Sequence, residues 1–526
     1  MNTPEPRTIR TVLERAVAET PDAPALVFEG ATYTYAELHE AALARLGALQ
    51  AEGFAAGSVV LVMLDNTDQS VVTWLAVALG GGVEVPVNTA LIGETLSHIV
   101  DDSGAEMVIT ERVFVDRLAA VARGSLHSIL VIDDVDGYEG DDAVRLLGSS
   151  AGPGVPVGRG ELAETAVMYT SGTTGPSKGA VITERHAFEY AGACAEMLEV
   201  TAADRYYAPL PLFHIAGRWA VVYAALQRGA TAVLVRRFSI SSFWDDVRHN
   251  DVTVTFLLGA MAQFVLNLPR RLDDDTSSLD RVLMVPLIED LDDFRSRFDV
   301  RVTTCFGSTE ANVPMVADWG VRATDGAGRV RNGYRVRLVD SDGQDVPTGT
   351  AGELWLAHDE AGMLVQRYHG NPEATAAAIQ DGWIHTGDVF MRDDRDHFHF
   401  VDRLKDSLRR RGENISSFEV EREVRSHPDV MDCAVVGVPS AFSEEEIAAF
   451  VQVSPEVSVT ADEIKAHVLN RAPKFLVPDH VYFVSEFPTT PTGKIQKFEL
   501  RNQLSASVGH DQVNRKDGSA RHADHN

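Results

Sequence analysis

Residues 169–179 read YTSGTTGPSKG, and this stretch is the strongest single indication of fold class and chemistry in the chain. It combines hydroxyl side chains, glycines and one lysine, Lys178, after a strand-like run at residues 166–168. A loop of this composition can wrap phosphates with backbone N–H groups, hydroxyls and one cation. It is not a Walker A loop, because Lys178 lies between Ser177 and Gly179 instead of preceding a Ser or Thr. A surface linker is the alternative interpretation, but a linker needs neither the lysine nor the apolar flanks.

Further motifs follow downstream: FGSTE at residues 306–310, WIHTGD at 383–388, DRLKD at 402–406 and PTGKI at 491–495. Singly each is weak, since an Asp after Gly is usually a turn residue and a charge run is usually a solvated face. In this order, however, they resemble the acyl-adenylate-forming superfamily, which includes acyl-CoA synthetases, nonribosomal adenylation domains and beetle luciferases. The resemblance covers about residues 8–503.

The resemblance implies an ATP-dependent enzyme that activates a carboxylic acid, with ATP, Mg²⁺ and coenzyme A as its cofactors and substrates. It implies catalytic roles for Lys494, His214, Thr309 and Glu310. The positions implied to bind ATP or coenzyme A are Thr170, Ser171, Gly172, Thr173, Thr174, Gly175, Lys178, Phe306, Gly307, Ser308, Asp388, Arg403, Gly412 and Glu413.

These assignments make chemical sense, because attack of a carboxylate on the α-phosphate brings anions together and needs charge neutralisation. Glu310 supplies a hard oxygen ligand suited to Mg²⁺. Phe306 would stack on adenine, although the family usually has Tyr there. Asp388 would accept the ribose hydroxyls with Arg403 beside it, and Lys494 would bridge the carboxylate and the α-phosphate.

The chain of 526 residues is too long for one hydrophobic core, so we expect at least two domains. Strand patterns alternating with helical patterns predict an α/β fold of layered sheets and helices. We expect a large N-terminal domain over residues 1–401 and a small mobile α/β lid over 402–504. The hinge is expected at 402–406, centred on Lys405, and the polar stretch 505–526 is expected to be disordered.

Composition narrows the partners and the location. The net charge of −30 argues against binding to nucleic acid or to anionic membranes. Three separated cysteines are typical of reduced thiols, and no apolar run is long enough to span a bilayer. No secretory signal opens the chain, so a cytoplasmic location is expected. A homodimer and a partner acyl carrier protein both remain open.

Transfer to coenzyme A is the preferred second step, because RRGENI at residues 410–415 looks like the form found in many acyl-CoA synthetases. A glycine at position 412 would let the backbone approach a pantetheine arm. In the family the lid rotates between the two steps. A stand-alone enzyme that loads a separate carrier protein is the alternative, and a non-catalytic nucleotide-binding relative is a third.

The acyl site is expected at two short segments with small side chains, containing His214, Ala216, Gly217, Gly259 and Ala260. Apart from Arg218 they carry no evident charge, so we expect a bulky or long apolar acid, such as a fatty or terpenoid acid. The alternative is that the small residues only allow close packing of helices on a sheet.

Overall fold

The structure, a computed structural model, describes most of the chain. The described residues are 7–121, 125–135, 143–148, 152–170, 177–404, 408–410, 413–415, 417–439, 445–454, 459–472, 474–489 and 495–504. The predicted tail at 505–526 lies outside them.

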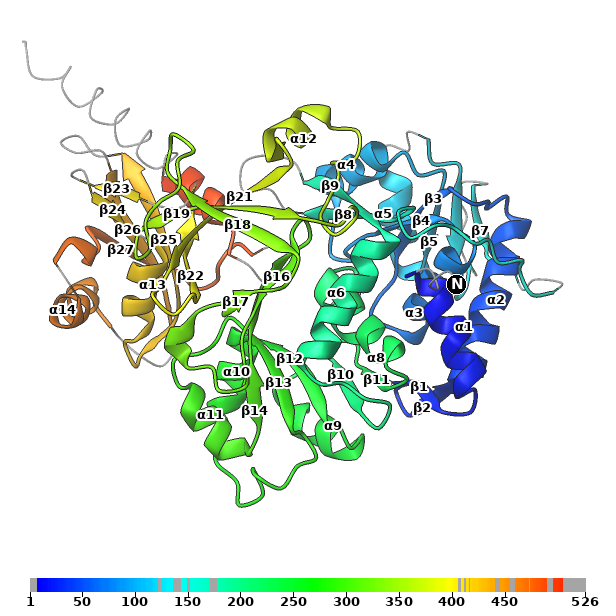
Figure 1. The fold of residues 1–526 in the computed structure, drawn as a ribbon, viewed down its shortest axis with the longest axis horizontal. Coiled ribbons are helices and arrows are strands. Elements are labelled where there is room, and N and C mark those ends of the chain that lie inside the picture. Colours follow the sequence, from blue (N-terminus) through cyan, green and yellow to red (C-terminus); the bar gives the residue numbers. More distant parts are fainter. Residues whose placement is uncertain are drawn as a thin grey trace, which may run out of the picture.

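One seven-stranded sheet has the strand order β7-β6-β5-β3-β4-β8-β9 and is formed by strands within residues 59–183 (Figure 1). Neighbouring strands are parallel except β8 and β9, which form an antiparallel pair. Its strands are β3 (Val59–Met63), β4 (Val83–Pro86), β5 (Met107–Thr110), β6 (Ser128–Val131), β7 (Val144–Leu146), β8 (Glu164–Thr170) and β9 (Lys178–Thr183).

A second seven-stranded sheet has the order β14-β13-β12-β10-β11-β1-β2 and is parallel except for β1 and β2. Its strands are β1 (Pro24–Phe28), β2 (Ala31–Thr34), β10 (Arg205–Ala208), β11 (Thr231–Leu234), β12 (Val254–Leu258), β13 (Arg281–Val285) and β14 (Arg301–Thr303).

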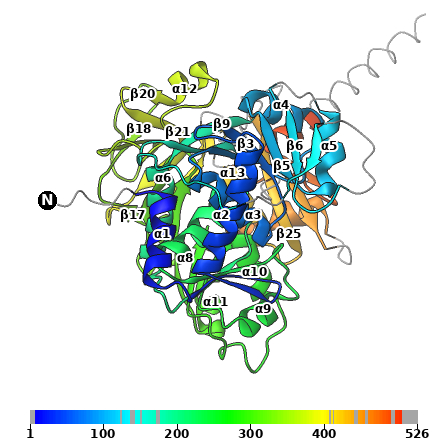
Figure 2. The same cartoon turned by 90° about the vertical axis from the view of Figure 1, so that its right-hand side faces the viewer.

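A shared layer of helices packs against both of these sheets, as two perpendicular views show (Figures 1 and 2). It contains α1 (Ile9–Glu19), α2 (Tyr35–Ala51), α3 (Asp68–Leu79), α6 (Glu184–Met197), the π-helix η2 (Arg218–Tyr223) and α8 (Ala224–Gln227). Their apolar side chains join Val60 and Val62 of one sheet and Tyr206 and Ala208 of the other in a single buried cluster. Leu61, between Val60 and Val62 on β3, points to the opposite face of the first sheet and belongs to a different buried cluster there. Strands buried on both faces explain why their sequences are almost continuously apolar.

The outer faces are covered by separate helices. α4 (Gly93–Ser103), η1 (Arg112–Phe114) and α5 (Val115–Ala120) cover the first sheet, and α9 (Phe243–His249), α10 (Gly259–Leu266) and α11 (Leu291–Phe298) cover the second. The predicted layered α/β fold is therefore confirmed.

Antiparallel strands follow the second sheet. One small sheet contains β15 (Cys305–Ser308), β16 (Asn312–Val316) and β17 (Arg329–Val330), and η3 (Ala323–Asp325) precedes β17. The next sheet contains β18 (Tyr334–Val339), β19 (Ala351–His358), β20 (Ile379–Gln380), β21 (Trp383–Arg392) and β22 (Phe398–Arg403), with α12 (Pro372–Ala378) before β20.

The C-terminal part is smaller and has a core of its own. A hairpin of β23 (Leu408–Arg410) and β24 (Glu413–Ile415) leads to α13 (Ser417–Arg425). A three-stranded sheet follows, with β25 (Val430–Pro439), β26 (Glu445–Val453) and β27 (His480–Phe483), together with α14 (Ala461–Arg471) and η4 (Lys474–Leu476). Residues 497–504 are helical. This small unit confirms the expected smaller C-terminal α/β domain, while its role as a mobile lid and its boundary at residue 402 stay predictions.

Among the described residues, no helix is both long enough and apolar enough to traverse a membrane.

Candidate active site

The predicted phosphate loop lies between β8 and β9, because Thr170 ends β8 opposite Lys178, which begins β9. Residues 171–176 lie outside the described residues, so the predicted contacts of Ser171, Gly172, Thr173, Thr174 and Gly175 stay predictions. Both flanks of the loop are anchored to α4. The Tyr169 hydroxyl donates to Asp102 Oδ2 at 2.6 Å, and the His98 ring nitrogen lies 2.8 Å from the Ser177 carbonyl oxygen.

Glu310 lies beside this loop, and two hydroxyl groups donate to its Oε1 atom. One comes from Thr170 at 3.2 Å and the other from Tyr368 at 3.1 Å. The Nζ atom of Lys178 lies 5.6 Å from the centre of the Tyr368 ring. Burial and the neighbouring Glu310 carboxylate raise the pKa of Tyr368 above its ordinary value, so the phenol stays protonated. Three segments that are distant in sequence therefore meet around one carboxylate.

Tyr368 was not among the predicted site residues. It reaches the site because its backbone forms a bridge with Ala180 of β9, and the neighbouring His369 N–H donates to the Gly179 carbonyl oxygen at 2.7 Å. Its contact with Glu310 depends on how two distant segments pack, which no local sequence pattern displays.

The turn that carries Glu310 is held by its own motif residues. A Cβ atom at Gly307 would lie 2.7 Å from the Asn312 carbonyl oxygen, which is closer than such contacts allow. Ser308 Oγ accepts the Ala311 N–H at 3.0 Å, and Thr309 is buried. The glycine and the serine of this motif therefore shape the turn, whatever they contact in a bound nucleotide.

Phe306 of β15 packs edge-on against Phe390 of β21, with ring centroids 4.8 Å apart. Phe390 follows Asp388 by two residues on the same strand. The predicted adenine-side aromatic residue and the predicted ribose-binding aspartate are thus joined by one aromatic contact.

Asp388 and Arg403 face each other on the neighbouring strands β21 and β22, and Arg403 Nε lies 3.1 Å from Asp388 Oδ1. Asp388 is buried, so little water screens its carboxylate from the neighbouring Arg403 cation. Gly387 has a left-handed backbone, with φ of 68°, and its N–H donates to Glu353 Oε1 at 3.1 Å. Glu353 therefore holds the turn in front of Asp388.

His214 begins the short helix α7 (Ile215–Gly217), where its Nδ1 atom accepts the Ala216 N–H at 3.2 Å. Acceptance at Nδ1 places the proton of the neutral ring on Nε2. Ala216 and Gly217 are buried, whereas Ala260 is exposed.

The glycines near His214 have a packing reason. A Cβ atom at Gly217 would collide with the backbone oxygens of Leu210 and Pro211, and one at Gly259 would lie 2.7 Å from the Pro286 oxygen. These two positions therefore fit the close-packing alternative, whereas the two alanines keep the pocket interpretation open.

Arg218, the single charge on these segments, is buried and already satisfied. It forms an ion pair with Glu84 of β4, donates to the Leu212 carbonyl oxygen at 2.8 Å, and lies over the Trp74 ring. Burial lowers the pKa of Arg218 to about 9, a value at which the guanidinium is still charged at neutral pH. Because its charge is balanced within the protein, Arg218 does not present a cation for a second carboxylate of a substrate.

The remaining predicted residues belong to the C-terminal part. Lys405, Gly412 and Lys494 lie outside the described residues, and Glu413 is described only as backbone of β24. Nothing in the described structure tests their predicted roles.

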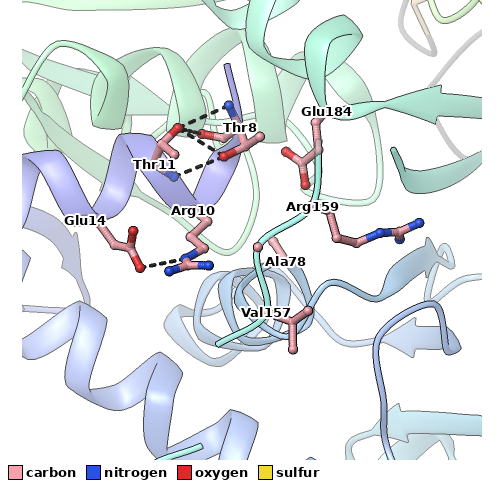
Figure 3. A pocket seen from close by; sticks show the side chains of 9 residues that line it. Thr8, Arg10, Thr11, Glu14, Ala78, Val157, Arg159 and Glu184 are labelled. Atoms are coloured by element: carbon pink, nitrogen blue, oxygen red, sulfur yellow. Dashed lines mark hydrogen bonds and ion pairs between the residues drawn. The ribbon is translucent and has the colours of Figure 1, made fainter. Parts of the chain in front are cut away.

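A cavity of about 210 Å³ lies elsewhere, between α1, residues 157–159 and the start of α6 (Figure 3). The residues that line it include none of the predicted site residues. It is therefore separate from the candidate active site.

Comparison with known proteins agrees with this arrangement. Residues 13–368 match the AMP-binding enzyme family, and residues 419–494 match the AMP-binding enzyme C-terminal domain. The crotonobetaine/carnitine–CoA ligase of Salmonella heidelberg (strain SL476) is 30% identical to the chain, over 91% of this chain and 96% of that protein. The crotonobetaine/carnitine–CoA ligase of Proteus mirabilis (strain HI4320) is also 30% identical, over 91% of this chain and 95% of that protein.

Solved structures share the fold. The anthranilate CoA ligase AuaEII in complex with anthranoyl-AMP superposes with a TM-score of 0.87 at 23% identity, covering 96% of this chain and 99% of that one. ATP-bound MatB from Rhodopseudomonas palustris gives 0.84 at 25% identity, with coverage of 95% and 99%. The O-succinylbenzoate coenzyme A synthetase of Bacillus subtilis, bound to AMP, gives 0.81 at 25% identity, with coverage of 95% and 98%. The chain therefore belongs to the AMP-binding enzyme family and is an acid–thiol ligase.

Proposed function

We propose that this enzyme activates an apolar carboxylic acid in two steps. In the first, the substrate carboxylate attacks the α-phosphorus of ATP, pyrophosphate leaves, and an acyl-adenylate forms. In the second, the thiol of coenzyme A attacks the acyl carbonyl, AMP leaves, and the thiol proton passes to solvent or a nearby base. The observation that carries this proposal is the convergence of the Thr170 and Tyr368 hydroxyls on Glu310, with Lys178 Nζ near the Tyr368 ring.

Mg²⁺ fits Glu310 as a partner. Among the described residues no cluster of three His, Cys, Asp or Glu side chains could hold a metal ion. Mg²⁺ does not need one, because in nucleotide sites it usually takes one or two carboxylates, substrate phosphates and water. The two hydroxyls that donate to Glu310 Oε1 orient this carboxylate. A bound Mg²⁺ would neutralise phosphate charge during the first step.

The protein side chains supply the remaining positioning. Lys178 offers positive charge beside the predicted phosphate loop, and Asp388 with Arg403 offers an acceptor and a donor for ribose or phosphate. Lys494 is proposed to stabilise the charge that moves between carboxylate and phosphate, and such electrostatic stabilisation is usually the largest single contribution to catalysis. His214 is proposed to lie at the carboxylate end of the acyl site.

The apolar nature of the acid is supported by Arg218. Its pairing with Glu84 balances the single charge on the predicted acyl segments. Burial of hydrocarbon is favourable by about 25 cal/mol per Å², so an uncharged wall favours an apolar substrate. A bulky fatty or terpenoid acid remains the proposed class.

The test is pyrophosphate release from purified enzyme across a panel of carboxylic acids, with and without coenzyme A. We expect release with apolar acids, and acyl-CoA as the product when coenzyme A is present. Pyrophosphate release without acyl-CoA would indicate the alternative, loading of a carrier protein. A preference for acetate or propionate over every bulky acid would contradict the proposed substrate class.

A further inference from the structure

We propose that Lys497 is a positioning residue for adenylate formation. With Ser417 and Glu421 it holds the lid against the strand that carries Arg403. This inference rests on the proposed function, because it assigns Lys497 to one of the two half-reactions.

Lys497 opens the final helical segment, and its ammonium group has two close partners on α13. Its Nζ atom lies 2.6 Å from Ser417 Oγ and 2.7 Å from Glu421 Oε1. The side chains of Lys497 and Glu421 are 17% and 6% exposed, so water screens this pair little. The final helical segment is thereby attached to α13.

Ser417 continues the connection to β22. Its hydroxyl accepts from Lys497 and donates to Asp402 Oδ1 at 3.2 Å, while its backbone N–H donates to Asp402 Oδ2 at 2.6 Å. Asp402 is buried and immediately precedes Arg403, the partner of Asp388. A continuous series of polar contacts therefore runs from the final helical segment to the predicted nucleotide-binding pair.

The charges in this series balance one another. Burial raises the pKa of Asp402, whereas the nearby Lys497 charge and the Ser417 donors act in the opposite direction. Glu421 also accepts the Val435 N–H at 2.8 Å and contacts Arg425 at 3.3 Å. A neutral residue at position 497 would leave Asp402 without its nearby cation. Buried polar networks of this kind are best supported as devices that select one arrangement of packed elements.

The arrangement selected here keeps the β23–β24 hairpin away from the phosphate loop. Leu408 and Ile415 of the hairpin belong to the core of the lid itself. Figure 1 shows the hairpin at the far left of the molecule, well apart from β8 and β9, which lie right of the middle. In the predicted lid mechanism, thioester formation needs that hairpin at the active site. The contacts of Lys497 therefore belong to the other lid orientation, the one assigned to adenylation.

The segment just before Lys497 is also fixed. Thr489 forms a backbone bridge with Ile495, and the Gln496 N–H donates to the Pro488 carbonyl oxygen at 2.7 Å. Asp402 precedes Lys405, the centre of the predicted hinge, whereas Ser417 and Lys497 follow it. Loss of the Lys497 contacts should therefore loosen the lid with respect to Arg403 and misalign the first half-reaction.

The experiment measures the two half-reactions separately in Lys497→Met, using the best acid from the panel. ATP–pyrophosphate exchange reports adenylation, and transfer from a synthetic acyl-adenylate to coenzyme A reports the second step. We expect the rate of ATP–pyrophosphate exchange to fall about 10- to 100-fold, the effect typical of reacting groups misplaced by about 1 Å. The rate of acyl transfer to coenzyme A should stay within about threefold of wild type. Lys497→Arg, which keeps the charge and donors, should restore most of the exchange.

Two further variants sharpen the test. Ser417→Ala removes the connecting hydroxyl without stranding a charge, so it should lower exchange in the same direction but less. Lys465→Met is the matched control, because Lys465 is a lid lysine on α14 that donates to the Asp479 carbonyl oxygen at 2.6 Å. It should leave both half-reactions unchanged.

Several results would overturn the inference. One is an unchanged rate of ATP–pyrophosphate exchange in folded Lys497→Met. Another is an equal fall in the rates of both half-reactions, together with a lower melting temperature. If Lys497→Met does not fold, unchanged exchange in Ser417→Ala decides against it. Failure of the proposed function itself looks different, because the wild-type enzyme would then release no pyrophosphate with any acid.

Discussion

The Tyr368 hydroxyl donates to Glu310 at 3.1 Å, although the two residues are 58 positions apart in the chain. This contact holds the carboxylate proposed to face Mg²⁺, and it comes from a residue that was not among the predicted site residues. It makes Tyr368 the clearest addition that the structure brings to the predicted site.

Replacement of Tyr368 by Phe should weaken adenylation moderately. One hydrogen bond contributes about 0.5–1.5 kcal/mol, so ATP–pyrophosphate exchange should fall about two- to tenfold, with a higher Mg²⁺ requirement. Mg²⁺ titration of the exchange rate measures this. Tyr33→Phe is the control, because it removes a comparable contact to Asp68 at 2.7 Å away from the predicted site residues. Equal effects of both variants would contradict a role specific to Glu310.

Lys494→Ala should abolish adenylate formation in a folded protein. Removal of one charged donor beside the transferring group costs on the order of a hundred- to a thousandfold. ATP–pyrophosphate exchange measures the loss, and circular dichroism confirms the fold. Near-normal exchange would rule out the assignment made from the PTGKI motif.

Ala216→Phe tests the acyl pocket. If Ala216 lines it, activity on the largest acids should fall by at least about tenfold, while activity on small acids is kept or increases. Pyrophosphate release across a chain-length series measures this. An equal loss on all acids would instead support the close-packing alternative.

Gly217→Ala supplies the matched comparison. Its new Cβ would meet backbone oxygens, so we expect destabilisation of about 1–3 kcal/mol without a selective change in acid preference. Gly192→Ala in α6 controls for the added methyl group, because the nearest atom there is 3.4 Å away. Urea denaturation of both variants measures the difference.

Glu184→Gln should change how stability depends on pH. Glu184 is buried, accepts the Ile9 N–H at 2.9 Å, and burial raises its pKa to about 6 from an ordinary 4.5. A raised carboxyl pKa favours folding below about pH 4.5, and this contribution is lost as the pH rises through about 6. At pH 7.5 the Gln variant should therefore be more stable than wild type by up to about 2 kcal/mol.

Chemical denaturation at several pH values between 4.5 and 7.5 measures the effect. Glu196→Gln, at an exposed position of the same helix, controls for the loss of one negative charge. A stability difference that does not grow with pH would show that Glu184 is not the titrating group.

The sequence predicted the fold well where the pattern is local. Strands such as β3 and β5 are almost wholly apolar because both of their faces are buried, and the apolar run at residues 71–79 forms most of α3. Motifs identified Glu310, Asp388 and Arg403, and the structure brings the last two together as an ion pair. These features depend on short stretches of chain, which a sequence displays directly.

Long-range contacts were beyond the sequence. Neither the approach of Tyr368 to Glu310 nor the pairing of Arg218 with Glu84 has a local signal, because each depends on how distant segments pack. The small residues near His214 were ambiguous for the same reason, since only the neighbouring backbone shows that Gly217 has no room for a side chain.

The shared helical layer has a consequence for how the chain can be divided. The helices α1, α2, α3 and α6 form one buried cluster with strands of both seven-stranded sheets. Neither sheet can therefore bury its inner apolar face without the other part of the chain. Cleavage of the chain between residues 152 and 160 would therefore give fragments that expose apolar surface, and these fragments would regain the native fold only by binding each other. The lid core draws only on residues after 407, so the lid could melt on its own while the remainder loses structure in a single cooperative transition.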